Sequence, residues 1–505
     1  MKRASVILVI AGLCGAARAS DWTDKVEFSG YLQSDLRYVI EDYRGPRPGE
    51  GFRFEMNRND LNLRLKIHPD PSAQAVVDAR FRFYGFNESA TLPELVRRTR
   101  VDPYDFQLNE AYLAVRGHPF DAMDFRVGRL IESWGTADMF NPTDNLNARD
   151  FSDPLDYTAK VPNQMIEVSV YPTDWLTLTG VFVPVFKPSL LPPSASLGFA
   201  VETTRDGCFL RAPTPPLSRA DIHRLQGLFA MADPCRLSFA PEVRTVTPPL
   251  NFRNSQAAVR AKVQADLGEH GGALDLSFSY FYGRFTFPVA YTAVANLVQS
   301  SQNPDVTEVR YTAQMIYPRM HVAGADFAYS PPVDWLPGLF GEVALIFPEQ
   351  VTFGLAVLKN GVLQPSLLFS GVNVPRTPFV KATVGVDYTF TSWLYMNVQY
   401  VRGFFDEFND RYGLHNYLAP AVELKFFEDE WKIRLAGAWN LDDLSAAVFP
   451  ELTVVVVPSI ELTGGVWAYL GDTKPLDPQS YAGRSKFGQK ATGRSVAYLK
   501  ARVTW

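Results

Sequence analysis

The stretch DLNLRLKI at residues 60–67 alternates strictly between polar and apolar side chains. The same alternation returns in VDARFRFY at residues 77–84, in VKATVGVDYTF at residues 380–390 and in the terminal AYLKARVTW at residues 497–505. Successive side chains of a strand point to opposite faces, so each stretch predicts a strand with one apolar and one charged face. The sequence therefore predicts an all-β chain built from amphipathic strands.

Soluble β-sandwiches also alternate, and a secreted soluble β-protein is the alternative to a membrane barrel. Three features favour the barrel. The segments reach about ten residues, the length that a tilted strand needs to cross a bilayer. Tyr, Phe and Trp lie near the ends of the apolar faces, as interfacial girdles do. The chain also ends on the aromatic Trp505. We predict a transmembrane, antiparallel, up-and-down β-barrel.

The connectors between these strands alternate between short and long. Short turns are predicted near residues 68–71, 117–119, 171–174, 268–272, 330–332, 391–392, 428–430 and 458. Long connectors are predicted at 41–51, 87–106, 133–162, 187–250, 288–306, 348–377, 406–413, 441–445 and 471–493. This pattern gives about 18 strands, with about 16 as the alternative. It requires one long strand over 307–330, with Pro318 above the bilayer.

The N-terminal residues 1–19 predict a secretory signal peptide. Lys2 and Arg3 precede a short apolar stretch, and Ala17-Arg18-Ala19 forms a small-x-small cleavage site. Cys14 raises lipidation as an alternative, although Leu13 stands where a lipoprotein signal needs a small side chain. A signal peptide and a barrel together predict the outer membrane of a Gram-negative cell. The partners are then outer-membrane lipid, the barrel-assembly machinery and small solutes, and the sequence leaves homo-oligomer formation open.

Composition and motifs argue against several other functions. The formal net charge is −5 and no basic block occurs, which argues against a nucleic-acid partner. No two of the six histidines have metal-ligand spacing, and no nucleophile elbow or phosphate loop occurs. We therefore predict no enzyme, metal or cofactor, with an outer-membrane enzyme as a minor alternative. Cys208 and Cys235 predict a disulfide in an exported protein, with two free thiols as the alternative.

The strand register predicts which charged residues face the lumen. The predicted inward acids are Asp60, Asp78, Glu110, Glu167, Asp275 and Asp387. The predicted pore-lining bases are Arg64, Lys66, Arg80, Arg82, Arg126, Arg260, Lys262 and Lys381, together with Lys432, Arg434, Lys500 and Arg502. A basic lining favours anions. The alternative is that these rows cross-link neighbouring strands and stiffen the wall.

The most distinctive segment is RVGRLIESWGTADMFNPTDNLNARDFSDPLDY, beginning at residue 126. Its Gly-Arg, Trp-Gly and Asn-Pro-x-Asp steps resemble a group of largely uncharacterised porin-like bacterial outer-membrane proteins. That resemblance implies a barrel whose loop 133–162 folds into the lumen and narrows it. The residues expected in this constriction loop are Trp134, Asp138, Asn141, Asp144, Asp150, Asp153 and Asp156.

The loop acids have three interpretations. They could face wall bases such as Arg64 and Arg80 across a narrow gap. They could bind calcium, although their spacing differs from the twelve-residue calcium loop. They could also cap the backbone of turns, as Asp and Asn do.

Apolar residues are common in two long connectors, over Val289 to Val298 and Val351 to Val374, whereas the longest connector, 187–250, is Pro-rich. Apolar patches in loops indicate a partner or ligand, or loops that pack together as a lid. The apolar connectors support the rival given below, whereas the basic lining makes passive passage of small, anionic solutes our main hypothesis. The rival is a plugged transporter of a hydrophobic compound.

Overall fold

The structure is a computed structural model. It describes residues 25–471 and 494–505, except 43–52, 87–91, 154, 157, 192–236, 300–306, 334, 366–367, 410–412 and 443. The predicted signal peptide and its cleavage site, Cys14, Cys208 and Cys235 lie outside these residues.

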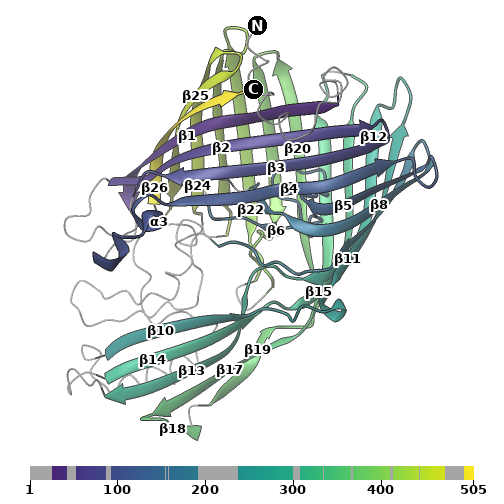
Figure 1. Ribbon diagram of the computed structural model, residues 1–505. Helices are drawn as coiled ribbons and strands as arrows, with labels where there is room; N and C mark the ends of the chain where they lie inside the picture. The colour runs from purple at the N-terminus through teal and green to yellow at the C-terminus, as the bar shows by residue number, and fades with distance from the viewer. Residues whose placement is uncertain are drawn as a thin grey trace, which may run out of the picture.

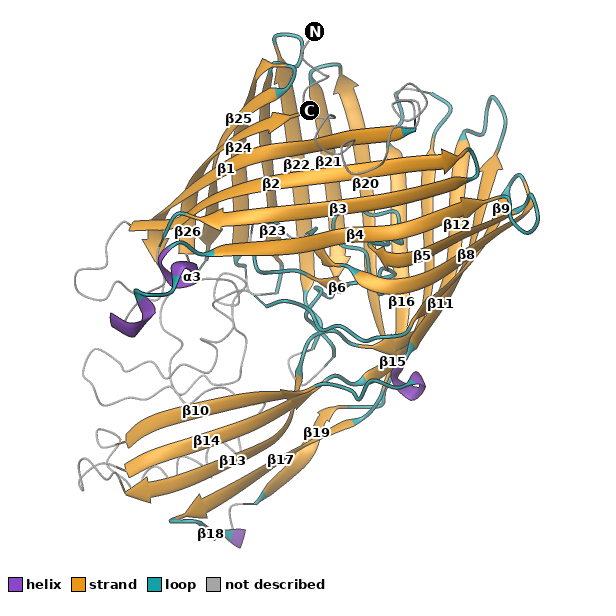
Figure 2. Ribbon diagram, in the orientation of Figure 1, coloured by secondary structure: helices purple, strands orange, loops and turns teal. Residues whose placement is uncertain are grey.

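Eighteen strands form one closed antiparallel barrel (Figures 1 and 2). In chain order they are β1 (Val26–Asp42), β2 (Arg53–Asp70), β3 (Ala73–Tyr84), β4 (Tyr104–Arg116), β5 (Met123–Leu130), β8 (Asn163–Thr173), β9 (Leu176–Val183), β11 (Gln256–Asp266), β12 (Ala273–Arg284), β15 (Arg319–Ser330), β16 (Gly338–Pro348), β20 (Phe379–Thr391), β21 (Leu394–Arg402), β22 (Asn416–Phe426), β23 (Trp431–Asn440), β24 (Ala446–Val457), β25 (Ile460–Leu470) and β26 (Arg494–Thr504). Each pairs with the next, and β26 pairs back onto β1. Closure removes the sheet edges that would otherwise need partners.

The two ends of the barrel differ as the connector pattern predicts. Short turns join pairs such as β2 and β3 at one end, and Trp505 lies at this end, hydrogen-bonded to Gly30. Long connectors lie at the other end. The predicted count of 18 is confirmed, but the single strand over 307–330 is wrong. The chain breaks at Tyr317-Pro318, and only the second half, β15, joins the barrel.

The first half of that stretch belongs to a second sheet, which projects from the long-connector end (Figure 1). It contains β10 (Leu237–Val246), β13 (Val289–Gln299), β14 (Thr307–Ile316), β17 (Val351–Lys359), β18 (Val362–Leu363) and β19 (Phe369–Val374). Three neighbouring connectors, from β9, β12 and β16, supply these strands. The two apolar connectors, predicted as loops, therefore contain strands that pair with one another.

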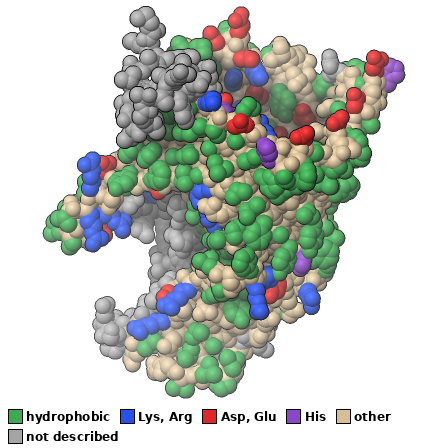
Figure 3. Space-filling model, turned by 45° about the vertical axis from the view of Figure 1, so that its right-hand side comes forward, with side chains coloured by type: hydrophobic (Ala, Val, Ile, Leu, Met, Phe, Trp, Pro, Cys, Tyr) green, Lys and Arg blue, Asp and Glu red, His purple; other side chains and the backbone are tan. Residues whose placement is uncertain are grey.

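The outer face of the barrel is apolar. Large hydrophobic side chains at alternate positions are exposed along the strands, as at Leu32, Phe278, Val343 and Leu499. Figure 3 shows this face as a broad area of hydrophobic side chains. Water does not stabilise such a surface, whereas the hydrocarbon core of a membrane does.

Among the described residues, helical structure is limited to short turns. They are η1 (Leu92–Glu94), α3 (Arg98–Val101) and η4 (Phe252–Asn254). No helix among the described residues has the length and apolar character needed to cross a membrane.

The core lies inside the barrel, toward the long-connector end. One cluster of buried residues joins loop 133–162 to inward side chains of β8, β9, β11, β12, β15, β16 and β20; its members include Trp134, Leu146, Phe151, Met165, Phe281 and Ile346. A second cluster joins Phe140 to β21 through β26 and includes Val401, Tyr417, Ala438 and Trp467. Apolar inward residues at this end thus require a loop to cover them.

Candidate functional site

The chain between β5 and β8 lies inside the barrel. It carries a short ladder of β6 (Ala148–Arg149) and β7 (Lys160–Val161), and Figure 1 shows β6 within the outline of the barrel. Trp134 and Leu146 are each 2% exposed, so the loop has a packed interior. The loop is therefore a folded element in the lumen, and three parts of the wall hold it.

The first attachment joins Asp153 to β1 and β2. The Arg37 guanidinium donates to both Asp153 oxygens at 2.7 Å, and the Arg58 guanidinium lies 3.1 Å from Oδ2. Asp35 and Asp60 bind the same two arginines from the wall side. Burial alone would raise the pKa of the Asp153 carboxyl, but Arg37 and then Arg58 outweigh it and hold the pKa well below its usual range. Asp153 therefore stays ionised.

The second attachment is Glu342 on β16. One carboxylate oxygen accepts hydrogen bonds from the backbone N–H groups of Thr136 and Ala137 at 2.6 Å and from Asn141 Nδ2 at 2.9 Å. The other accepts from the Thr143 hydroxyl at 2.9 Å. Glu342 is 4% exposed, so these four donors take the place of water around a buried carboxylate.

The third attachment lies on β20 and β21. The Thr383 hydroxyl donates to the Phe140 carbonyl at 2.6 Å, and Asn397 Nδ2 donates to Asp138 at 2.9 Å. The loop is thus bonded to β1–β2, to β16 and to β20–β21, which lie around much of the barrel circumference.

The motif residues have a structural reason in this arrangement. Gly135 has a φ of +102°, and a Cβ there would overlap the Glu342 carboxylate. Gly128 has a φ of +142°, and a Cβ there would overlap the backbone of β4. Asn141 donates to Glu342 and to the Ala137 carbonyl, so it fixes the turn that presents both N–H groups. The Gly-Arg, Trp-Gly and Asn-Pro-x-Asp steps therefore shape the loop and its second attachment.

The remaining loop acids act within the loop. Asp144 pairs with Arg149 at 3.1 Å and with Lys160 at 2.5 Å. Asp150 and Asp156 accept from the backbone N–H groups of Ser152 and Ala159, which is the turn-capping role. Each predicted loop acid thus has its own partner. Among the described residues, no three His, Cys, Asp or Glu side chains form a metal-binding group.

The predicted meeting of loop acids with Arg64 and Arg80 is wrong. Arg64 lies 3.3 Å from Glu110 on the wall, and no loop acid pairs with Arg80 among the described residues. The loop pairs instead with Arg37 and Arg58, which the sequence analysis missed. Their one signal was inward alternation on β1 and β2, where Asp35, Arg37, Arg58 and Asp60 share a face.

The other predicted lining bases divide into paired and unpaired groups. Wall carboxylates bind several: Lys66 lies 3.3 Å from Glu27, Arg82 3.7 Å from Asp60, Arg126 2.6 Å from Glu167, and Lys262 2.9 Å from Asp275. Arg260 lies over the Trp134 ring at 5.0 Å. Among the described residues, the bases without an ion pair include Arg80, Arg434 and Lys500. Arg82 and Lys381 are 7% exposed, so they differ from residues that line open water.

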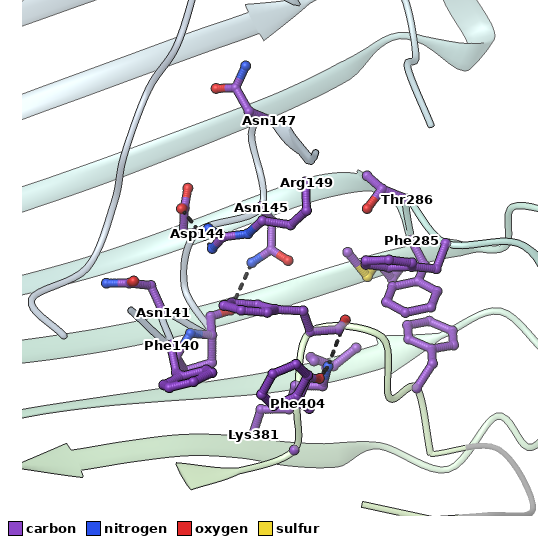
Figure 4. A pocket seen from close by; sticks show the side chains of 17 residues that line it. Phe140, Asn141, Asp144, Asn145, Asn147, Arg149, Phe285, Thr286, Lys381 and Phe404 are labelled. Carbon is purple, nitrogen blue, oxygen red and sulfur yellow. Dashed lines mark hydrogen bonds and ion pairs between the residues drawn. The ribbon is translucent and has the colours of Figure 1, made fainter. Parts of the chain in front are cut away.

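Lys381 lines a cavity between the loop and the wall (Figure 4). Its ammonium group donates to the Phe404 carbonyl at 2.7 Å and lies 5.8 Å from the centre of the Phe285 ring. Arg149, on the opposite side, lies 4.2 Å from the centre of the Phe405 ring. Cations and aromatic rings thus border the same space, which suits a solute with an anionic group and an apolar body.

A second cavity of about 160 Å³ lies beyond Phe140 and Phe404, which border both spaces. Arg434 and Lys500 line it. The carboxylates on this cavity include Asp138, bonded to Asn397, and Glu451, which accepts from the Tyr498 hydroxyl at 2.7 Å. Basic groups therefore line both cavities in turn: Arg149 and Lys381 on the first, and Arg434 and Lys500 on the second, which borders the wall of β23 to β26.

Glu132 lies immediately before loop 133–162, and its raised pKa predicts that the stability of the protein depends on pH. Burial, and then the nearby charge of Glu167, raise the pKa of Glu132 to about 7, although Arg126 opposes the shift. A raised carboxyl pKa means that stability is fully present below about pH 4.5 and is lost as the pH rises through about 7. Glu132→Gln should therefore be more stable than the unmodified protein, and its advantage should grow between about pH 5 and pH 8. The gain in free energy of unfolding is at most roughly 3 kcal/mol, and it is followed as a rise in melting temperature. An unchanged gap in melting temperature across this range would contradict the assignment.

Comparisons with known proteins give a distant structural resemblance. No protein-family model and no curated protein sequence matches the chain. Among solved structures, the chain resembles a mutant of the porin of Rh. blastica, with 10% identity and a TM-score of 0.38 over 95% of this chain and 100% of that one. It also resembles OmpF of Salmonella typhi in complex with daunomycin, with 8% identity and a TM-score of 0.38 over 95% and 97% of the two chains. OprB of Pseudomonas putida gives 9% identity and a TM-score of 0.38 over 96% and 95%.

Proposed function

We propose that this chain is an outer-membrane channel that passes small anionic solutes passively through a lumen narrowed by loop 133–162. The observation that carries the proposal is the closed barrel with an apolar outer face and a charged inner face, in which a folded loop is bonded to the wall on three sides. A sealed sheet satisfies its backbone groups in hydrocarbon, and a barrel of this width encloses water.

The charge of the narrow region supports anions. Donors bind the loop acids Asp153 and Asp144 and the wall acid Glu342. The narrow region therefore presents few free carboxylates. Arg80, Arg434 and Lys500 form no ion pair with any residue that the structure describes. An unpaired cation beside a narrow aqueous path lowers the energy of a passing anion.

Charge reversal on the second cavity tests this selectivity. Arg434→Glu combined with Lys500→Glu should lower the anion-to-cation permeability ratio by roughly thirtyfold, since each change is worth about 1 kcal/mol near a narrow path. Reversal potentials in a salt gradient across planar bilayers measure the ratio. The same reversal at Arg98 on α3, which is exposed outside the barrel, is the control and should leave the ratio unchanged.

Two results would contradict the proposal. Unchanged reversal potentials in the double variant would remove the anion selectivity. Absence of stable single-channel currents from the folded, heat-modifiable protein would remove the open channel and favour the rival, a plugged transporter. Swelling of liposomes in sugars, organic acids and lipidic compounds would then identify the solute class.

A further inference from the structure

Two arginines lie side by side on the outer face of the barrel, at the long-connector end. Arg284 closes β12 and Arg319 opens β15, and the two are register partners. Outward positions on β12 are marked by the exposed Phe278 and Tyr280, and Arg284 follows at the same alternation. The guanidinium groups therefore face the membrane side of the wall rather than the lumen.

Neutral acceptors hold this pair together. Asn254 Oδ1, on η4, accepts from Arg284 at 2.8 Å and from Arg319 at 3.0 Å. The Tyr317 carbonyl accepts from Arg284, and the Arg253 carbonyl from Arg319, each at 2.6 Å. Neither guanidinium forms an ion pair with a carboxylate within the described part of the chain. The arrangement thus fixes two like charges in place without neutralising them.

The surroundings leave the patch positively charged. Arg253 is a third arginine next to the pair in the chain fold: its side chain is exposed, and its backbone carbonyl accepts from Arg319. Glu349 is the adjacent carboxylate, and its Oε2 accepts from the Arg319 backbone N–H at 3.0 Å. Three arginines therefore stand against one carboxylate. Holding like charges together costs free energy unless an anion binds between them.

Aromatic side chains lie on the barrel side of this patch. Tyr282 and His321 are register partners and lie directly next to the arginines. The Tyr280 hydroxyl is 2.6 Å from His321 Nδ1, and the exposed Phe347 lies across from His321 on β16. Figure 3 shows basic side chains and a histidine at the margin of the apolar face. Such rings occupy the membrane interface, so the arginines lie at the level of lipid headgroups.

We propose that Arg253, Arg284 and Arg319 bind the phosphate groups of a phosphorylated glycolipid in the outer leaflet. The planar guanidinium matches phosphate bidentately, and interfacial basic clusters recognise anionic headgroups. Long connectors of membrane barrels face the cell exterior, which places the patch in the outer leaflet. This inference rests on the proposed membrane location but not on any conduction through the lumen.

Binding of purified bisphosphorylated lipid A to the detergent-solubilised full chain tests the proposal by native mass spectrometry. Arg284→Gln combined with Arg319→Gln should raise the apparent Kd by at least about tenfold, since each charged hydrogen-bonding group contributes about that factor. Arg253→Gln alone should raise it several-fold. This exposed side chain forms no hydrogen bond or ion pair with the described residues, so the variant folds even where the double variant does not. Dephosphorylated lipid A should bind the unmodified protein as weakly as phosphorylated lipid A binds the double variant.

The matched control is Arg116→Gln with Arg402→Gln, which removes the same charge from the two rims of the barrel. It should leave the Kd within about twofold, because surface charges beyond the Debye length are screened. Equal lipid A binding by the unmodified protein and the Arg284/Arg319 variant would overturn the site. Equally tight binding of inorganic phosphate would overturn the assignment to a lipid. Bilayer currents of that variant separate this result from the channel: lipid A binding without current contradicts only the proposed function.

Discussion

Replacing Asp153 by alanine should detach loop 133–162 from β1 and β2 and lower the free energy of unfolding by about 3–5 kcal/mol, the range for removing one partner of a buried ion pair. The buried cations Arg37, Arg58 and Arg82 are 3%, 7% and 7% exposed. Without Asp153 they would keep only Asp35 and Asp60 as acids, which leaves three cations against two carboxylates. The wall would then carry uncompensated buried charge. Heat-modifiable migration on gels measures the stability, and planar-bilayer recording should show larger and noisier currents as the loop moves.

Asp150 provides the control on the same loop. Its carboxylate accepts a hydrogen bond from Ser152 N–H at 2.9 Å and forms no ion pair among the described residues. Asp150→Ala should therefore cost about 1 kcal/mol, the net contribution of one hydrogen bond. Equal losses in the two variants would show that the Arg37–Asp153–Arg58 cluster does not hold the loop.

The barrel could be predicted from the sequence because its cause is local. Alternation depends on neighbours two residues apart, and turn residues such as Gly271 and Gly272 mark where a strand ends. The second sheet could not be predicted in this way. The partners of β13 include β14 and β17, and β10 pairs in parallel with β14, far along the chain. The sequence of an apolar connector therefore looks alike whether the connector binds a ligand or pairs with another strand.

The strand over 307–330 shows the limit most clearly. Pro318 lacks an N–H group, and its place in a strand interior costs a ladder bond. The prediction treated 307–330 as one strand with Pro318 above the bilayer, which kept the number of strands even. The number of barrel strands was correct, but only because the first half of this stretch belongs to the second sheet. The structure loses no ladder bond there, because β14 ends at Ile316 in the second sheet and β15 begins only at Arg319. The Pro318 carbonyl accepts from Phe285 N–H at 2.9 Å.

The loop could be located in the sequence, but its wall partners could not. Asp153 stood out because acids gather after the Asn-Pro-x-Asp step. Its partner Arg37 is 116 residues away, and pairing at that distance depends on the path of the whole loop. Glu342 did leave a signal: it is the charged residue in GLFGEVALIFP, residues 338–348, among apolar inward neighbours. A lone inward carboxylate on an otherwise apolar strand indicates a buried set of donors.

Glu342→Ala should have an effect of similar size at the second attachment. It removes the acceptor for the Thr136 and Ala137 N–H groups, for Asn141 and for Thr143. Each buried donor left without an acceptor costs about 1–3 kcal/mol, so the two backbone N–H groups alone predict a loss of roughly 2–6 kcal/mol. Asn141 keeps the Ala137 carbonyl as an acceptor. Glu342→Gln keeps one acceptor oxygen and should recover most of this loss, because that oxygen can serve the two N–H groups.

The combined Asp153→Ala and Glu342→Ala variant then tests whether both residues hold the same element. If each stabilises only its own part of the wall, the two losses add within about 0.5 kcal/mol, as for independent sites. If both hold loop 133–162, the first change already loosens the loop, so the second costs less than it does alone. The single-channel current should likewise rise mainly with the first change. Additive losses of stability, with a separate rise in current for each change, would contradict a single loop held between β1–β2 and β16.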